Sequence, residues 1–264
     1  MNTDTGTILA HIPTEQREPV MAIRGVYKSF GNNHVLVDFN LDLYKGENVV
    51  VLGKSGSGKS VLIKCIIGLL KPELGTIEVF NENIPDLDIA DLDKIRARVG
   101  FLFQSNALYD SMTVRDNLEF PLRRHWIKVT QEEVNTMVMD ALEDVGLAHT
   151  VDMMPVELSG GMRKRIALAR TLILKPDIIL YDEPTTGLHM NDIKKLLGSF
   201  DALIEQGHSI LVIEHNTDVI KSADWVIDLG PEAGDGGGAG RPRRPAPCPR
   251  DVQAPWGPPG SRPW

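Results

Sequence analysis

The feature that most constrains the fold is a glycine-rich loop, which reads Gly53-Lys54-Ser55-Gly56-Ser57-Gly58-Lys59-Ser60. It fits the pattern G-x-x-x-x-G-K-[ST], in which backbone N–H groups wrap closely around phosphate oxygens. Such a loop needs a buried strand before it and a helix after it. The apolar run at residues 48–52 and the apolar segment at residues 61–67 supply both. The sequence therefore predicts a phosphate-binding loop, and the predicted site extends to Val61.

Each part of this loop has a chemical reason. Glycines adopt the left-handed dihedrals that let a backbone approach an anion, and the N-terminus of the following helix adds a positive dipole. We expect Lys59 to neutralise the β- and γ-phosphates and the Ser60 hydroxyl to contact Mg²⁺. ATP with Mg²⁺ is the predicted ligand.

Bulk composition sets limits on the class of protein. A chain of 264 residues with 42% hydrophobic and 24% charged residues suits one buried α/β domain with a subdomain. The net charge of -8 argues against nucleic acid as a partner. Cys65 and Cys248 form no C-x-x-C pair, and Cys65 reads as a small core residue.

Nothing in the sequence predicts a membrane span or a signal peptide. Lys64 interrupts the longest apolar run, and the first residues lack a charged-then-apolar pattern. We therefore expect a cytoplasmic protein, and if it serves transport, other chains must supply the pore.

The order of predicted elements favours a mainly parallel sheet. Apolar strands at residues 99–103, 178–181, 209–213 and 225–228 alternate with helical segments. Residues 21–26 and 35–43 alternate apolar and polar positions, and the first reads as an edge-type strand. Residues 106–157 show helical periodicity and read as an insertion in the α/β core.

Acidic and polar residues follow several of these strands. Asp182 and Glu183 end the strand at 178–181, where side chains of an open α/β sheet face the ligand crevice. We expect Asp182 to hold Mg²⁺ through water and Glu183 to polarise the attacking water. Gln104 would contact Mg²⁺ and that water, and His215 would hydrogen-bond the γ-phosphate.

The run Leu158-Ser159-Gly160-Gly161-Met162 opens a predicted helix at 162–174. Ser159 suits the N-cap, while the two glycines let a phosphate approach the helix start. The basic residues 163–165 read as a solvated face. Phe30 fits either a ring stacked on adenine or a core aromatic.

Together these motifs resemble the ATP-binding-cassette ATPases over residues 20–238. The resemblance implies a RecA-like P-loop NTPase fold, with an antiparallel β edge and an inserted α-helical signature subdomain at about 106–160. It assigns Phe30 to adenine stacking, residues 53–60 to Walker A, Gln104 to the Q-loop and Leu158 to Met162 to the signature. Asp182, Glu183 and His215 become Walker B, the catalytic glutamate and the switch histidine. It further implies a head-to-tail dimer of two copies, each ATP lying between one Walker A and the partner's signature.

Residues 21–187 are similar to the Mla type of transporter ATPase, through Phe101 to Tyr109, residues 119–122 and residues 158–165. That likeness implies phospholipid transport, an integral membrane permease, accessory lipid-binding proteins and a place on the cytoplasmic face of the inner membrane. Residues 184–238 instead resemble the end of UvrA, the DNA-damage-recognition ATPase, through segments such as 212–216 and 223–231. His189 stands where transporters usually carry aspartate in the loop that contacts the partner subunit.

Residues 1–19 read as a flexible arm and residues 239–264 as a Pro-, Gly- and Arg-rich disordered tail. A docking role and a non-native end both fit that tail. Three functions fit the whole pattern: a transporter ATPase, a UvrA-like DNA-repair ATPase, and a nucleotide-binding module without turnover.

Overall fold

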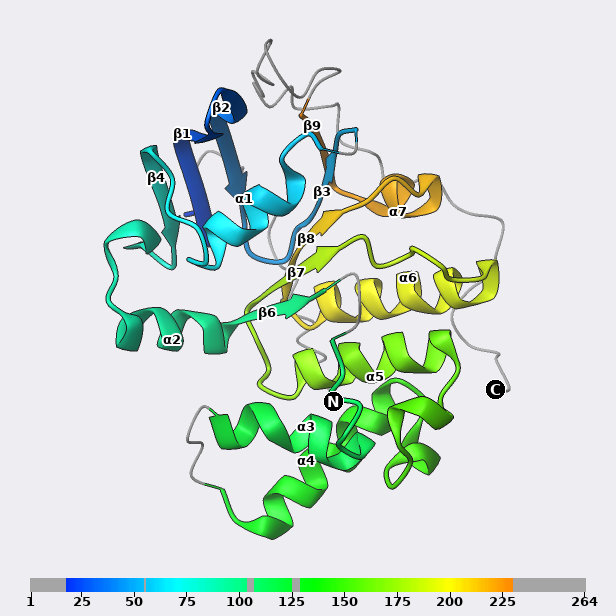
Figure 1. Ribbon diagram of the computed structural model, residues 1–264. Coiled ribbons are helices and arrows are strands. Elements are labelled where there is room, and N and C mark those ends of the chain that lie inside the picture. The colour runs from blue at the N-terminus through cyan, green and yellow to red at the C-terminus, as the bar shows by residue number, and fades with distance from the viewer. Residues whose placement is uncertain (1–17, 55, 104–106, 125–128, 230–264) are drawn as a thin grey trace, which may run out of the picture.

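The computed structural model describes residues 18–54, 56–103, 107–124 and 129–229. These residues form two β-sheets with helices packed around them (Figure 1). The larger sheet has five parallel strands in the order β6-β7-β8-β3-β9, and the smaller has four antiparallel strands in the order β2-β1-β4-β5. The α/β class, with its mainly parallel core and antiparallel addition, is confirmed.

The three central parallel strands are buried on both faces, as their continuous apolar sequences predict, and the two outer strands are partly buried. Their bounds are β3 (Asn48–Leu52), β6 (Val99–Leu102), β7 (Ile178–Asp182), β8 (Ser209–Ile213) and β9 (Trp225–Asp228). Successive side chains point to opposite faces, so Val49 and Val51 enter one core while Val50 enters the other. The same alternation runs through β7 and β8, and the sheet therefore separates two apolar layers.

The antiparallel sheet lies against one of these layers. Its strands are β1 (Met21–Phe30), β2 (Asn33–Leu43), β4 (Leu74–Val79) and β5 (Glu82–Asn83). The prediction that residues 21–26 form an edge strand is wrong, because β1 pairs with β2 on one side and with β4 on the other. Alternating polarity reports which face of a strand is buried, and it does not report how many neighbours the strand has.

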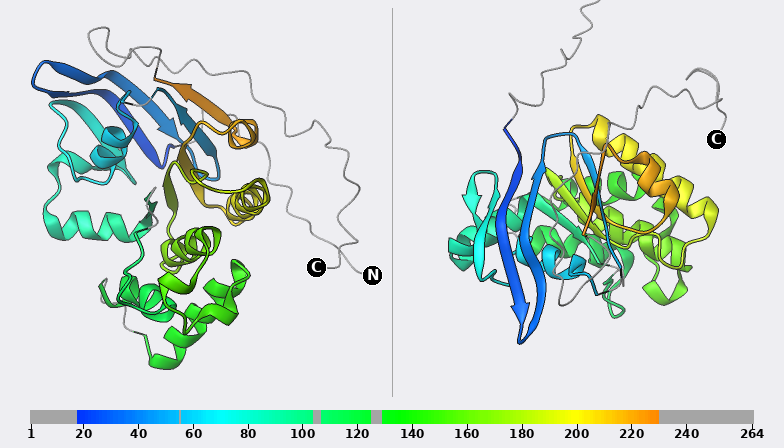
Figure 2. Two further views of the ribbon diagram at one scale, coloured as in Figure 1. Left: turned by 45° about the vertical axis from the view of Figure 1, so that its right-hand side comes forward. Right: turned by 90° about the horizontal axis from the view of Figure 1, so that it is seen from above.

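Helices cover both faces of the parallel sheet. Their bounds are α1 (Lys59–Ile66), α2 (Ile89–Arg98), α3 (Val114–Arg124), α4 (Gln131–Asp144), α5 (Gly160–Leu172), α6 (Met190–Glu205) and α7 (Thr217–Ser222), with short 3₁₀ turns at Ile84–Asp86, Ala148–Thr150 and Pro155–Glu157. Helix α1 packs in the layer beneath the antiparallel sheet, and α5 and α6 pack on the opposite face. Figure 2 shows α3 and α4 beyond α5, away from the strands.

Several local signals set the helix ends. Helix α1 stops at Ile66, and Gly68 then takes a left-handed φ of 68°. Thr130 and Glu133 form a capping box that begins α4 within the predicted helical region. Cys65 is fully buried, as expected, and burial raises the pKa of its thiol to about 11.

Among the helices that the structure describes, none combines the length and the apolar character needed to cross a bilayer. The expected N-terminal arm, up to residue 17, and the expected tail lie outside the described residues.

Candidate functional site

The predicted site residues come together because three parallel strands end at the same edge of the sheet. Val51 of β3 is in register with Ile213 of β8, and Ile213 is in register with Asp182 of β7. The phosphate loop follows β3, Glu183 follows β7, and His215 comes two residues after β8. The edge formed by the carboxyl ends of these strands therefore collects groups that are far apart in the sequence.

The phosphate loop has the backbone geometry that its glycines predict. Gly56 has a φ of 81° and Gly58 a φ of 94°, both in the left-handed region. A Cβ on Gly58 would lie 2.7 Å from the Val35 Cγ1 atom and 2.9 Å from the Val35 carbonyl oxygen. The loop is therefore packed tightly against β2. Ser55 lies outside the described residues, and Lys54 is exposed.

Two buried polar groups inside the loop suit an anionic ligand. The Lys59 ammonium donates to the carbonyl oxygens of Gly53, at 2.5 Å, and of Lys54, at 2.9 Å. Burial lowers the pKa of Lys59, while the charges of Glu183 and Asp182 oppose that lowering. The Ser57 hydroxyl is buried, and among the described residues it finds no hydrogen-bond partner. A buried cation and an unsatisfied hydroxyl within a ring of backbone groups fit a phosphate.

The Ser60 and Asp182 side chains at this edge fit Mg²⁺. The Ser60 hydroxyl donates to the Asp182 carboxylate at 3.4 Å, which joins the start of α1 to the end of β7. Burial raises the pKa of Asp182, and the neighbouring Glu183 charge adds to that rise. Within the described residues no three His, Cys, Asp or Glu side chains group to hold a metal alone. A hydroxyl and one carboxylate beside a phosphate cradle are nevertheless the kind of site that Mg²⁺ shares with nucleotides.

Glu183 and His215 face each other across this edge. The His215 Nε2 atom lies 4.0 Å from Glu183 Oε1, and the Glu183 N–H donates to the Ile213 carbonyl at 2.9 Å. Glu183 has a left-handed φ of 50°, which is uncommon for a residue with a side chain and occurs often at functional sites. The arrangement holds a carboxylate and an imidazole together beside the phosphate loop.

The signature residues lie elsewhere. Ser159 caps α5 by accepting from the Met162 N–H at 3.2 Å, so the helix begins two residues before the predicted start. Ser159 and Gly160 are exposed, whereas a Cβ on Gly161 would lie 2.9 Å from the Asp192 carboxylate of α6. Because α5 and α1 pack on opposite faces of the parallel sheet, the signature and the phosphate-loop helix belong to different layers.

The remaining predicted residues are placed as follows. Phe30 is 50% exposed at the end of β1, with the Lys28 ammonium 5.5 Å from its ring centroid. The core alternative for Phe30 is therefore wrong, while stacking on adenine stays a prediction. Val61, in the first turn of α1, is partly buried against the core. Gln104 lies outside the described residues.

Two features of this region differ from or go beyond the sequence analysis. Residues 163–165 are not a solvated face: Lys164 donates to the Pro184 carbonyl at 2.8 Å and to the Thr186 carbonyl, and Arg165 donates to the Val145 carbonyl at 2.8 Å. Glu214 was missed, although its carboxylate is buried between the ends of β7 and β8. The only sequence signal for it was an acid directly after an apolar strand.

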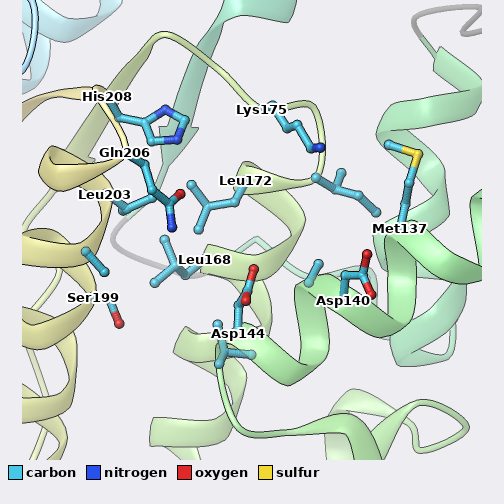
Figure 3. Close-up of a pocket in the computed structure, with 14 residues that line it drawn as sticks. Met137, Asp140, Asp144, Leu168, Leu172, Lys175, Ser199, Leu203, Gln206 and His208 are labelled. Atoms are coloured by element: carbon cyan, nitrogen blue, oxygen red, sulfur yellow. The ribbon is translucent and has the colours of Figure 1, made fainter. Parts of the chain in front are cut away.

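A separate cavity of about 410 Å³ lies between α4, α5 and α6 (Figure 3). Its floor is apolar, with Leu168 and Leu172 of α5, and Asp140 and Asp144 of α4 stand at its rim. None of the predicted nucleotide-site residues that the structure describes lines it. This cavity is therefore not the nucleotide site.

Known proteins are similar to this chain in sequence and in fold. The profile of a family described as "ABC transporter" matches residues 36–186. The probable ribonucleotide transport ATP-binding protein mkl of Mycobacterium leprae is 40% identical over 220 residues, covering 81% of this chain and 62% of that protein. The chain thus spans about six tenths of the length of that relative. The glutamate transport ATP-binding protein GluA of Corynebacterium glutamicum is 37% identical, covering 79% of this chain and 86% of that protein.

Two further similarities bear on function. The chloroplastic protein Trigalactosyldiacylglycerol 3 of Arabidopsis thaliana is 42% identical over 172 residues, covering 62% of this chain and 49% of that protein. A solved dimer of the ATP-binding cassette MJ0796, in a post-hydrolysis state bound to ADP and Pi, is 32% identical with a TM-score of 0.73. The match covers 79% of this chain and 93% of the MJ0796 chain.

Proposed function

The chain belongs to the ABC transporter family of ATP-binding cassette ATPases, and we propose that it hydrolyses ATP to power transport through a separate membrane permease. The family's fold binds ATP with Mg²⁺, and a solved relative holds the products ADP and Pi. One observation carries the proposal most directly. The buried Lys59, the Ser60–Asp182 pair and the facing Glu183 and His215 all lie at one edge of the parallel sheet.

Each of these residues has a distinct role in the proposed reaction. Lys59 and the loop N–H groups bind the phosphates, and Ser60 and Asp182 hold Mg²⁺, which neutralises charge that develops on the phosphate oxygens. Glu183 orients the attacking water and accepts its proton. His215 donates to the γ-phosphate, and Gln104 contacts Mg²⁺ and the attacking water.

A second copy of the chain completes the proposed site. Ser159 and Gly160 are exposed at the N-terminus of α5, where a helix dipole and backbone N–H groups favour an anion. In a head-to-tail dimer, the signature residues 159–162 would cover the ATP on the partner's phosphate loop. The dimeric state of the solved relative supports this arrangement.

The proposed permease contact lies beside the segment that contains Gln104. Phe103 is 42% exposed and Tyr109 is 43% exposed, one on each side of residues 104–106. The Tyr109 ring packs on Phe120 of α3 at 4.9 Å, and Arg170 of α5 donates to the neighbouring Ala107 carbonyl at 2.7 Å. Exposed aromatic side chains on both sides of this segment suit a helix of a partner protein. This contact would place the chain on the cytoplasmic face of the inner membrane.

We propose a phospholipid as the transported substrate. The motivating observation is the likeness of residues 101–109 and 158–165 to the Mla type, together with a relative whose name contains that of a galactolipid. Other relatives are named for ribonucleotide and glutamate transport, so these two substrates are the competing outcomes of the test. Accessory lipid-binding proteins belong to this proposal.

Hydrolysis is tested first on the chain alone. Replacing Glu183 by Gln removes the base but keeps the side-chain volume, so phosphate release should fall by about 10²–10⁴-fold. Binding of a fluorescent ATP analogue should persist, because the phosphate loop is unchanged. Hydrolysis by the Glu183→Gln variant at the rate of the unmodified chain would show that Glu183 is not the base.

The transport proposal needs the complex. The chain should co-purify from membranes with a multi-span protein, and Tyr109→Ala should weaken that association. Leu74→Ala, which changes an exposed apolar residue of β4, is the matched control and should not. In vesicles reconstituted with the complex, ATP should drive movement of a fluorescent phospholipid. ATP-dependent uptake of glutamate or a ribonucleotide instead would overturn the lipid assignment.

The resemblance of residues 184–238 to UvrA leads to a different test. A gel-shift assay at low salt with damaged and undamaged duplexes measures DNA binding directly. We expect no shift, since the net charge is -8 and two relatives are named as transport proteins. Preferential binding of damaged DNA would favour the repair function.

A further inference from the structure

Glu214 is a buried acid that the proposed reaction does not use. It lies between Ile213, the last residue of β8, and His215, and it is 3% exposed. A buried carboxylate is costly unless its oxygens are well hydrogen-bonded. Its surroundings therefore reveal what it holds in place.

Four donors satisfy this carboxylate, and they come from two separate segments. Oε1 accepts from the Thr185 N–H at 2.7 Å and from the Thr185 hydroxyl. Oε2 accepts from the His215 N–H at 2.7 Å and from the Asn216 N–H at 2.9 Å. One oxygen thus binds the turn after Glu183, and the other binds the loop that carries His215.

Lys164 also binds the turn at residues 184–186. From α5, its ammonium donates to the carbonyl oxygens of Pro184 and Thr186. Burial lowers the pKa of Lys164, and the Glu214 charge opposes that lowering. An anion and a cation therefore both bind the turn at residues 184–186, Glu214 through the Thr185 N–H and hydroxyl and Lys164 through two carbonyl groups.

The contacts made by Glu214 and Lys164 affect the facing pair Glu183 and His215. Glu183 comes directly before the turn and keeps a left-handed φ of 50°. Its carboxylate is 4.0 Å from the His215 imidazole, although 32 residues separate the two in the sequence. Displacement of the turn or the loop would change that distance, and misplacement by about 1 Å can cost roughly 100-fold in rate.

We propose that Glu214 is a positioning residue for ATP hydrolysis, which ties the Thr185 turn to the His215 loop so that Glu183 and His215 keep one geometry. This inference rests on the proposed roles of Glu183 and His215. It predicts that loss of the tie lowers turnover, whereas ATP binding by the phosphate loop is retained.

The central experiment combines substitutions. Glu214→Gln keeps the shape but turns amide hydrogens toward N–H donors. It should lower kcat by about 10- to 100-fold and change the ATP dissociation constant by less than about 3-fold. In a His215→Ala background the same change should lower kcat by less than about 2-fold further, because residues that act through one another are not additive.

Controls separate positioning from general destabilisation. Glu119→Gln changes another buried acid, which is 4% exposed in α3 and paired with Arg123, and it should leave basal kcat within about 2-fold of the unmodified chain. If Glu214→Gln fails to fold, Thr185 supplies a milder test. Thr185→Val removes one donor and should lower kcat, whereas Thr185→Ser keeps the hydroxyl and should restore it.

The outcomes are distinguishable. If His215→Ala hydrolyses ATP at the rate of the unmodified chain, the proposed role of His215 fails and the positioning role fails with it. If His215→Ala is slow but Glu214→Gln is as fast as Glu119→Gln, only the positioning role fails. If the Glu214→Gln and His215→Ala rate losses multiply in the double variant, the two residues act independently and the positioning role fails.

Discussion

Gly58 offers the sharpest quantitative test of how the phosphate loop is built. Its φ of 94° is strained for any residue with a Cβ, which costs about 1–2 kcal/mol. A Cβ there would also lie 2.7 Å from Val35 Cγ1 and 2.9 Å from the Val35 carbonyl oxygen, and such overpacking costs about 1–3 kcal/mol. Gly58→Ala should therefore destabilise the chain by about 2–5 kcal/mol, with the loop pushed away from β2.

Gly56 is the matched control within the same loop. Its φ of 81° is similarly left-handed, but no other part of the described chain would lie within 4 Å of a Cβ on Gly56. Gly56→Ala should cost only the conformational strain of about 1–2 kcal/mol. The difference between the two variants isolates the contact with β2.

Thermal unfolding followed by circular dichroism without nucleotide measures both effects. For a domain of this size, 1 kcal/mol corresponds to about 2–4 °C in Tm. Gly58→Ala should lower Tm by about 4–20 °C, and Gly56→Ala by about 2–8 °C. Equal losses in the two variants would refute the proposed packing of the loop against β2.

Three further predictions concern the residues around this loop. Asp182→Asn should raise Tm at pH 7 in the absence of Mg²⁺. The folded-state pKa of Asp182 lies above the unfolded one, so its stabilising contribution is complete at low pH and is lost as pH rises through the folded value. The gain in Tm should shrink toward pH 4. In this variant Mg²⁺ should no longer promote hydrolysis. A lower Tm for the variant at pH 7 would contradict the direction of the Asp182 pKa shift. Tyr181→Phe should stabilise the chain by about 1–3 kcal/mol, because the Tyr181 hydroxyl is buried without a hydrogen-bond partner among the described residues. The ring would keep its packing on Phe200. Urea unfolding measures the change in stability, and a loss of stability would indicate a partner for the hydroxyl. Cys65 should resist thiol reagents at pH 7.5 in the native state and react once urea unfolds the chain, because its pKa is about 11 and it is fully buried. Rapid labelling of the native protein would show that the core around Cys65 opens to solvent.

The sequence predicted the parallel sheet well for a physical reason. Strands buried on both faces are continuous apolar runs, so their limits and the polar residues that follow them stand out. Asp182, Glu183 and His215 were singled out by that position, and the structure brings them to one edge. The nucleotide roles given to them stay proposals.

The misassignments share one cause, which is that local patterns do not reveal distant neighbours. β1 alternates like an edge strand but has a partner on each side. Lys164 sits in a run of basic residues, yet its partners are the carbonyl oxygens of a turn 20 residues away or more. Glu214 depends on Thr185, 29 residues earlier, and no periodicity marks that contact.

The composite ATP site is the central claim, and Gly160 gives direct access to it. Among the described residues, a Cβ on Gly160 meets nothing within 4 Å, so a tryptophan fits the monomer but would stand where a partner's ATP must approach. Gly198, exposed in α6 with equally open space, is the matched control. All variants carry Glu183→Gln so that ATP is retained.

Size-exclusion chromatography with light scattering, together with titration of a fluorescent ATP analogue, decides the matter. With ATP, Glu183→Gln alone and Glu183→Gln with Gly198→Trp should both form dimers. With Gly160→Trp the chain should stay monomeric, while its ATP dissociation constant stays within about 2-fold of the Glu183→Gln monomer, because the phosphate loop of each copy is intact. A dimer that forms despite Gly160→Trp, or a monomer that loses ATP affinity, would contradict a site shared between two copies.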